Sequence, residues 1–126
     1  MNTPANASSL AAFADLQGKT ALVTGAFSGL GRHFALTLAR AGCRVALAGR
    51  RVEEGAKLQQ ELQAMGAASC VIRLDVRDPD SVAAALDDSQ QHLGPLDVLV
   101  NNAGVAITRP AVEHTEADWQ TVIDTN

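Results

Sequence analysis

A glycine-rich segment at residues 24–31, with the sequence TGAFSGLG, constrains the fold more than any other part of the chain. It follows the apolar run 20–23 and precedes a helical pattern, so a buried strand leads through a turn into a helix. The free N–H groups at a helix N-terminus and the positive end of the helix dipole favour a bound phosphate. Gly25 permits the turn, Gly29 lets the backbone approach a pyrophosphate, and Gly31 lets the helix pack closely on the strand. The segment therefore predicts a phosphate-binding loop.

Strand and helix patterns alternate along the rest of the chain. Apolar runs typical of strands covered on both faces occur at 19–24, 44–48, 70–74 and 96–101. Helical patterns lie between and after them, at 30–40, 52–65, 79–92 and from 115 onward. In the first helix we expect the buried face to consist of Leu30, Phe34, Leu38 and Ala41. We expect residues 1–17 to form a loosely ordered arm and residues 18–126 to form a dinucleotide-binding domain.

This alternation predicts an α/β fold with a parallel sheet, because each helix returns the chain to the start of the next strand. Right-handed crossovers then give a doubly wound, Rossmann-type sheet in three αβα layers, with strand order 3-2-1-4. Ligands of such sheets bind outside the carboxyl ends of the strands, where the strand order reverses. Unusual residues follow all of those ends: Gly25, then Gly49-Arg50-Arg51, then Asp75-Val76, then Asn101-Asn102-Ala103-Gly104.

Composition and charge argue against several other classes of protein. The net charge is -4 and the sequence pI is about 5.2, which disfavours nucleic acid as a partner. No apolar stretch is long enough to span a membrane, and the first residues lack the positive region of a signal peptide. Cys43 and Cys70 lie in apolar runs and are predicted to be buried thiols, as expected in a reducing cytoplasm. The histidines share no spacing with acids or cysteines, so no metal site is predicted.

Several motifs occur in a fixed order: T-G-x-x-x-G-x-G at 24–31, Asp75-Val76, Asn101-Asn102-Ala103-Gly104, and Asp118-Trp119 leading to Asp124-Thr125-Asn126. In combination they resemble the short-chain dehydrogenase/reductase family over essentially the whole chain after the arm. The resemblance implies an NAD(P)(H)-dependent oxidoreductase that transfers hydride between nicotinamide and a small alcohol or carbonyl substrate. It also implies a homo-oligomer for the full-length form.

The resemblance further implies roles for single residues. Beside the glycines, the loop residues that would contact the cofactor are Phe27, Ser28 and Leu30. Phe27 departs from the family, which has a small residue there, and is expected to crowd the adenosine phosphate region or to lie over it. The Asp75 carboxylate would accept from the adenine amino group, and the N–H of Val76 would donate to the ring. An alternative is that Asp75 only caps the chain that enters Asp78 and Pro79.

The family's segment that lines the adenosine ribose matches Asn102, Ala103 and Gly104. Its neighbour Asn101 is expected instead to tie the fourth strand to the strands beside it by hydrogen bonds.

The end of the second strand predicts the choice of cofactor. An NAD-binding site places an acidic residue there, about 20 residues after the glycines, to accept from the ribose 2′-OH. Gly49 stands at that position, and Arg50 and Arg51 follow it. Because a guanidinium can hold a 2′-phosphate through two hydrogen bonds, NADP(H) is favoured over NAD(H). The resemblance implies that the first of the two arginines, Arg50, is the main contact. The alternative for one of the two arginines is a solvated loop charge.

The catalytic side chains of the family are largely missing. Members use a Ser, a Tyr and a Lys, the last two in a Tyr-x-x-x-Lys motif, with an Asn upstream. Asn126 matches that Asn, but the chain contains no tyrosine. We therefore expect the chain to be the cofactor-binding half of an oxidoreductase, with an incomplete sheet of four strands, and to be inactive as written. A non-catalytic dinucleotide-binding or partner-binding module is the alternative, and the identity of the substrate stays open.

Overall fold

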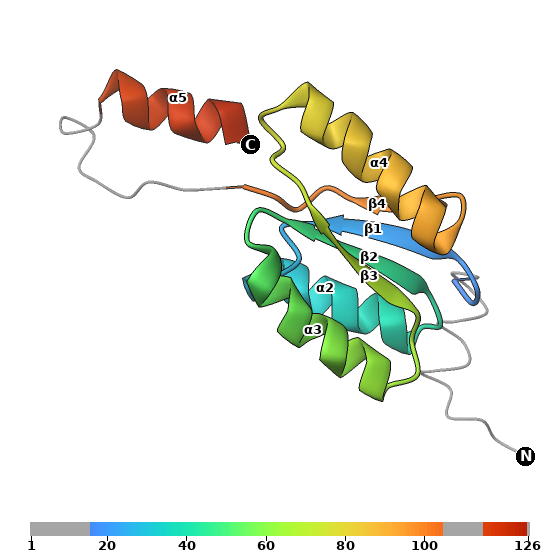
Figure 1. Ribbon diagram of the computed structural model, residues 1–126. Coiled ribbons are helices and arrows are strands. Elements are labelled where there is room, and N and C mark those ends of the chain that lie inside the picture. Colours follow the sequence, from blue (N-terminus) through green and yellow to red (C-terminus); the bar gives the residue numbers. More distant parts are fainter. Residues whose placement is uncertain (1–15, 105–114, 126) are drawn as a thin grey trace, which may run out of the picture.

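The computed structural model describes residues 16–104 and 115–125, which form an α/β unit (Figure 1). Its elements in chain order are β1 (Thr20–Thr24), α2 (Gly29–Arg40), β2 (Arg44–Gly49), α3 (Val52–Ala64), β3 (Ser69–Arg73), α4 (Pro79–Leu93), β4 (Val98–Val100) and α5 (Glu116–Thr125). The ranges expected from the sequence agree with these bounds to within two residues. The expected N-terminal arm, residues 1–17, lies almost entirely outside the described residues.

The four strands form one parallel sheet in the order β3-β2-β1-β4, as predicted. Leu22 of β1 lies opposite Ala46 of β2 and Leu99 of β4, which fixes the register at the centre of the sheet. Helices α2 and α3 cover one face and α4 covers the other (Figure 1). The predicted three-layer arrangement is therefore confirmed, and the carboxyl ends of the strands meet at one edge.

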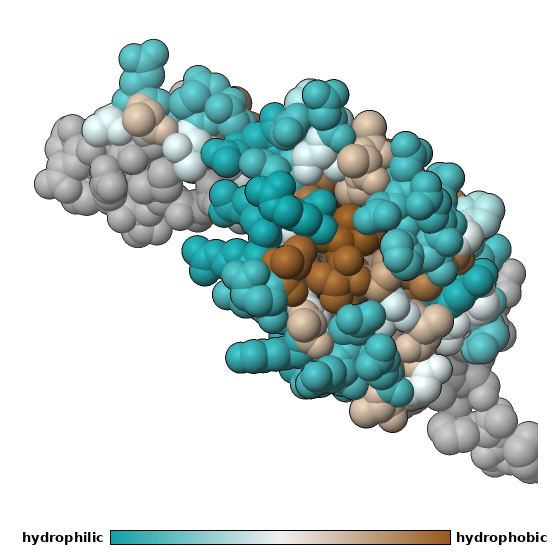
Figure 2. Space-filling view, viewed as in Figure 1, coloured by the Kyte–Doolittle hydropathy of each residue, from teal (hydrophilic) through white to brown (hydrophobic). Residues whose placement is uncertain are grey.

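Two apolar cores lie on the two faces of the sheet. The core beneath α2 and α3 includes Val23 and Leu47, and the core beneath α4 includes Leu22 and Ile72. On the face shown in Figure 2, apolar side chains gather over β3 and are bordered by the hydrophilic side chains of α3 and α4. β1 is buried along its whole length, which explains why its sequence is apolar without alternation.

Each core contains one cysteine, and both thiols are free and buried, as the sequence predicted. Burial raises the pKa of the Cys70 thiol to about 11, with a further contribution from the charge of Asp88. Burial also raises the pKa of Cys43, where Asp97 adds to the effect. Neither thiol is therefore suited to act as a nucleophile at neutral pH.

The expected buried face of α2 was wrong, because none of its residues is fully buried: Leu30, Phe34, Leu38 and Ala41. The residues that are buried are Gly31, Ala35 and Ala39, whereas Leu30 is 61% exposed. Phe34 and Leu38 are half-buried and pack at the borders of the core. The physical reason is close approach, since a row of small residues lets the helix axis lie near the sheet and leaves the larger side chains at its flanks.

Candidate functional site

A groove of about 460 Å³ lies at the carboxyl edge of the sheet, as the topology predicts. Every predicted cofactor-binding residue except Gly29 and Gly31 lines it: Gly25, Phe27, Ser28, Leu30, Arg50, Arg51, Asp75, Val76, Asn102, Ala103 and Gly104. The predicted catalytic Asn126 lies outside the described residues. The groove also includes residues that the sequence did not single out as contacts: Gly49, Glu54, Leu74, Arg77 and Thr125.

The glycines of residues 24–31 are required for two different reasons. Gly25 and Gly29 have φ of 61° and 56°, in the left-handed region that favours glycine. A Cβ at Gly31 would overlap the carbonyl oxygen of Gly25, so this position needs close approach and not an unusual backbone. A Cβ at Gly29 would meet nothing within 4 Å, so the backbone there is open to a ligand. A Cβ at Gly25 would lie 3.0 Å from the Cα of Ala103.

The N-terminus of α2 has no side-chain cap. Ser28 is its N-cap residue, yet it makes no side-chain capping hydrogen bond, and the first turn carries no acidic residue. The N-terminus of α4 differs, because the carboxylate of Asp78 accepts from the N–H of Asp80 at 3.0 Å. Helix N-termini whose N–H groups lack side-chain acceptors can hold an anion, and that of α2 borders the groove through Ser28 and Leu30.

Thr24 is a structural residue of the site that the sequence reasoning missed. Its Oγ1 accepts from the N–H groups of Asn102 and Ala103, both at 2.9 Å, across the ends of β1 and β4. The side chain of Asn102 in turn donates from Nδ2 to the carbonyl oxygen of Gly25 at 3.3 Å. These contacts join the loop after β4 to the glycine loop. The available signal in the sequence was a threonine as the last residue of an apolar run.

The hydroxyl of Thr24 also lies 3.4 Å from the carbonyl oxygen of Val100 and 3.5 Å from Oδ1 of Asn101. The expected link from Asn101 to a neighbouring strand is thus present as a long hydrogen bond.

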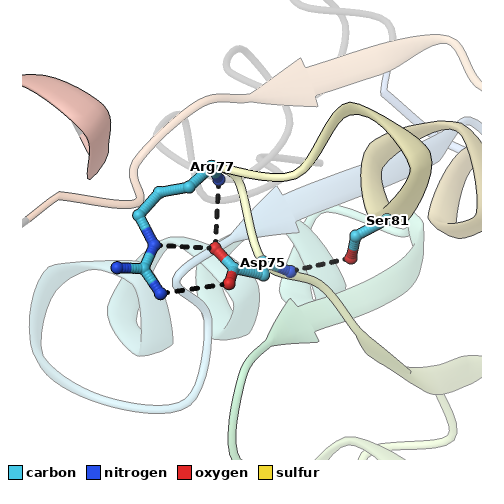
Figure 3. A network of polar contacts seen from close by, with 3 residues as sticks. All are labelled: Asp75, Arg77 and Ser81. Carbon is cyan, nitrogen blue, oxygen red and sulfur yellow. Dashed lines mark hydrogen bonds and ion pairs between the residues drawn. The ribbon is translucent and has the colours of Figure 1, made fainter.

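Asp75 lies at the end of β3 in a network with Arg77 and Ser81 (Figure 3). Its Oδ1 accepts from the N–H of Arg77 at 3.0 Å and from Nε at 3.2 Å, and its Oδ2 accepts from Nη2 at 3.2 Å. The hydroxyl of Ser81 accepts from the N–H of Asp75 at 2.9 Å. The hydrogen bonds from Arg77 lower the pKa of the Asp75 carboxyl, and the nearby charge of Arg50 lowers it further.

This geometry supports both interpretations of Asp75. The carboxylate shapes the turn between β3 and α4, as the alternative proposed, and it also faces the groove. Arg77 was missed by the sequence reasoning, although a basic residue two positions after the aspartate was a visible signal.

Arginines border the groove after β2. Arg51 forms an exposed ion pair with Glu54, with 3.6 Å between Nη1 and Oε1. The guanidinium of Arg50 has no hydrogen-bond or ion-pair partner among residues 16–104 and 115–125. Together with Arg77, these two arginines give the groove three guanidinium groups, against the two carboxylates of Glu54 and Asp75, and position 49 carries no acidic side chain. Such a site attracts anions.

The ring of Phe27 packs at the end of β2 and against the start of α3. A Cβ at Gly49 would lie 2.6 Å from Cδ2 and Cε2 of this ring, and a Cβ at Gly55 would lie 2.6 Å from Cε1. The ring therefore lies over the backbone of position 49, where an NAD-binding site would carry its acidic residue.

Two further findings concern the described residues, 16–104 and 115–125. No group of three or more His, Cys, Asp or Glu side chains there is placed to hold a metal ion. In that same part of the chain, no helix is both long enough and apolar enough to cross a membrane.

A family model described as short chain dehydrogenase matches residues 19–126. The chain belongs to the short-chain dehydrogenase family. Among its curated relatives, 2-dehydro-3-deoxy-D-gluconate 5-dehydrogenase of Escherichia coli (strain K12) is 38% identical over 117 residues, which are 93% of this chain and 45% of that enzyme. A 3-oxoacyl-[acyl-carrier-protein] reductase of Staphylococcus aureus (strain N315) is 43% identical over 110 residues, or 86% of this chain and 44% of the reductase.

Solved structures of short-chain dehydrogenases share the fold. A short-chain type dehydrogenase/reductase of Mycobacterium marinum superposes with a TM-score of 0.84 at 36% identity, covering 87% of this chain and 44% of that one. A short-chain dehydrogenase/reductase of Burkholderia phymatum in complex with NAD gives a TM-score of 0.82 at 34% identity, covering 87% of this chain and 39% of that one. The chain thus spans less than half the length of the relatives it matches.

Proposed function

We propose that this chain is the dinucleotide-binding part of a short-chain dehydrogenase that acts on a small alcohol or carbonyl substrate, and that it prefers NADP(H) to NAD(H). The observation that carries the proposal is the groove at the carboxyl edge of the sheet. The N-terminus of α2, which has no side-chain cap, and Arg50, whose guanidinium has no partner among the described residues, both border it.

The residues of the groove fit a dinucleotide. The N–H groups of the first turn of α2 hold the pyrophosphate, because no side chain caps them and Gly29 leaves the approach open. Oδ2 of Asp75 accepts one hydrogen bond from Arg77 and keeps a second lone pair for the adenine amino group. The N–H of Val76 donates to the ring, and residues 102–104 line the ribose.

The preference for NADP(H) rests on the charges around the ribose. Gly49 offers no carboxylate to accept from a 2′-OH, and none that would repel a 2′-phosphate. Arg51 already pairs with Glu54 on the surface, whereas Arg50 is available to bind the phosphate. Of the two arginines, Arg50 is therefore the principal contact.

When bound, the nicotinamide of the cofactor supplies or accepts the hydride. The proton would be handled by the family's tyrosine, which this chain does not contain. Binding without turnover is therefore the expected behaviour of the chain alone, with Asn126 as its one match to the family's catalytic residues. In its full-length form we propose a cytoplasmic homo-oligomer.

Calorimetric titration with NADP+ and NAD+ tests the proposal. The native chain should bind NADP+ more tightly, and Arg50→Ala should weaken NADP+ binding by roughly ten- to a hundredfold while leaving NAD+ nearly unchanged. Arg40→Ala is the matched control, since it removes the same charge from the far end of α2. Tighter binding of NAD+ by the native chain, or equal losses in both arginine variants, would refute the assignment.

A further inference from the structure

Two buried glycines, Gly49 and Gly55, flank the ring of Phe27. Neither has a positive φ, so the backbone conformation does not require glycine at either position. The three atoms nearest to a Cβ at Gly49 all belong to the Phe27 ring, at 2.6, 2.6 and 3.2 Å. Ordinary Cβ atoms essentially never approach other atoms within 3.0 Å. The space for a side chain at position 49 is therefore taken by Phe27.

The ring cannot easily move aside. A Cβ at Gly55 would lie 2.6 and 2.8 Å from Cε1 and Cζ, so the ring touches the backbone of α3 on that side. Phe27 is also half-buried against the core beneath α2 and α3. Because the ring is held between β2 and α3, any side chain added to β2 at this point must displace a packed aromatic group.

We infer that Phe27 is a specificity-determining residue: its ring excludes a side chain from position 49, and so excludes the carboxylate that an NAD(H) site would place there. This inference rests on the proposed preference for NADP(H) and gives it a steric cause in addition to the charge of Arg50. It also gives a role to the phenylalanine at position 27, where the family has a small residue. Phe27, in the loop after β1, thus limits which side chain position 49 at the end of β2 can carry, although the two positions lie 22 residues apart in the sequence.

A double-mutant cycle without cofactor tests the steric claim. Gly49→Ala should lower the thermal midpoint clearly in the native background, and should have little effect in the Phe27→Ala background, where the ring is gone. If Gly49→Ala is too unstable to purify, recovery of folded protein on adding Phe27→Ala gives the same answer. Equal shifts in both backgrounds would overturn the inference, because independent positions give additive effects.

Binding of NADP+ and NAD+ tests the consequence for specificity. Gly49→Asp alone should weaken binding of both cofactors, whereas Phe27→Ala with Gly49→Asp should fold and bind NAD+ at least about tenfold more tightly than NADP+. Retained preference for NADP+ in that folded double variant would overturn the inference. A native chain that prefers NAD+ would refute the proposed cofactor instead, and the cofactor-free cycle would still decide the steric claim.

Discussion

Gly31→Ala is the substitution whose outcome the geometry defines most closely. The added Cβ would lie 2.6 Å from Nδ2 of Asn102 and 2.8 Å from the carbonyl carbon of Gly25, with the carbonyl oxygen closer still. Two of these atoms are backbone, and Asn102 is held by its own hydrogen bonds to Thr24 and Gly25. Relief of the overlap therefore requires α2 to move away from the glycine loop.

Two opposing effects determine how much Gly31→Ala lowers the free energy of unfolding. Overpacking of a close contact costs about 1–3 kcal/mol, and the rigid backbone neighbours favour the upper end. Replacing a helical glycine by alanine returns about 1 kcal/mol of helix propensity. The net loss in the free energy of unfolding is thus about 2 kcal/mol, which for a domain of roughly 100 residues lowers the melting temperature by about 8–16 °C. Gly31→Val should lose more.

Circular dichroism melts and calorimetric titration with NADP+ provide the measurements. Gly66→Ala is the control, because Gly66 lies after α3, has φ of 78° and leaves a Cβ with nothing within 4 Å. It should show only the cost of its backbone conformation and should bind NADP+ as the native chain does. Gly31→Ala should lose both stability and affinity, since the N–H groups of the first turn move. A native melting temperature and native affinity in Gly31→Ala would refute the close packing of α2 on the loop.

Three further predictions concern other parts of the molecule. The pKa of the Asp75 carboxyl lies below the ordinary value of about 3.9, so its contribution to stability is present above about pH 3.9 and is lost as the pH falls through the lowered pKa. NMR titration of the carboxyl group should show a higher pKa in Arg77→Met, and an unchanged pKa would contradict the network with Arg77. Cys70, with a pKa of about 11, should react with a thiol reagent at pH 8 only after unfolding, and fast labelling of the folded chain would contradict its burial. β4 pairs only with β1 in the described part of the sheet, and Leu99 is 60% exposed. Light scattering should therefore show association of the native chain, and Leu99→Lys should reduce it. A monomeric native chain would show that this edge is protected.

The sequence predicted the fold and most of the groove because both follow from local patterns and one topological rule. Strand order and the edge that carries the site follow from βαβ alternation, and Gly25, Asp75 and Asn102 stand where strands end. Contacts between distant segments were not predictable in this way. The bonds from Thr24 to the loop after β4 cross 78 and 79 positions, and no periodicity in either segment reports them.

The same limit explains the error on α2. A helical pattern ranks side chains by their hydropathy, so it placed Leu30 in the core. The distance between helix and sheet is set instead by the smallest residues at the contact, Gly31, Ala35 and Ala39. That distance depends on both the helix and the sheet, so the sequence of the helix alone does not predict it.

The glycines around the groove show what this distinction means for substitution. Gly29 is required by its left-handed backbone, so asparagine, which tolerates that region, should be accepted there more readily than alanine. Gly31, Gly49 and Gly55 are required by neighbouring atoms, so every side chain is disfavoured until the neighbour itself changes. Gly25 combines both reasons, with a φ of 61° and the Cα of Ala103 at 3.0 Å from the position of a Cβ. In the sequence all of these positions are simply glycines. The three-dimensional contacts decide at which of them a second substitution, of the neighbouring residue, can restore the stability that the first one lost.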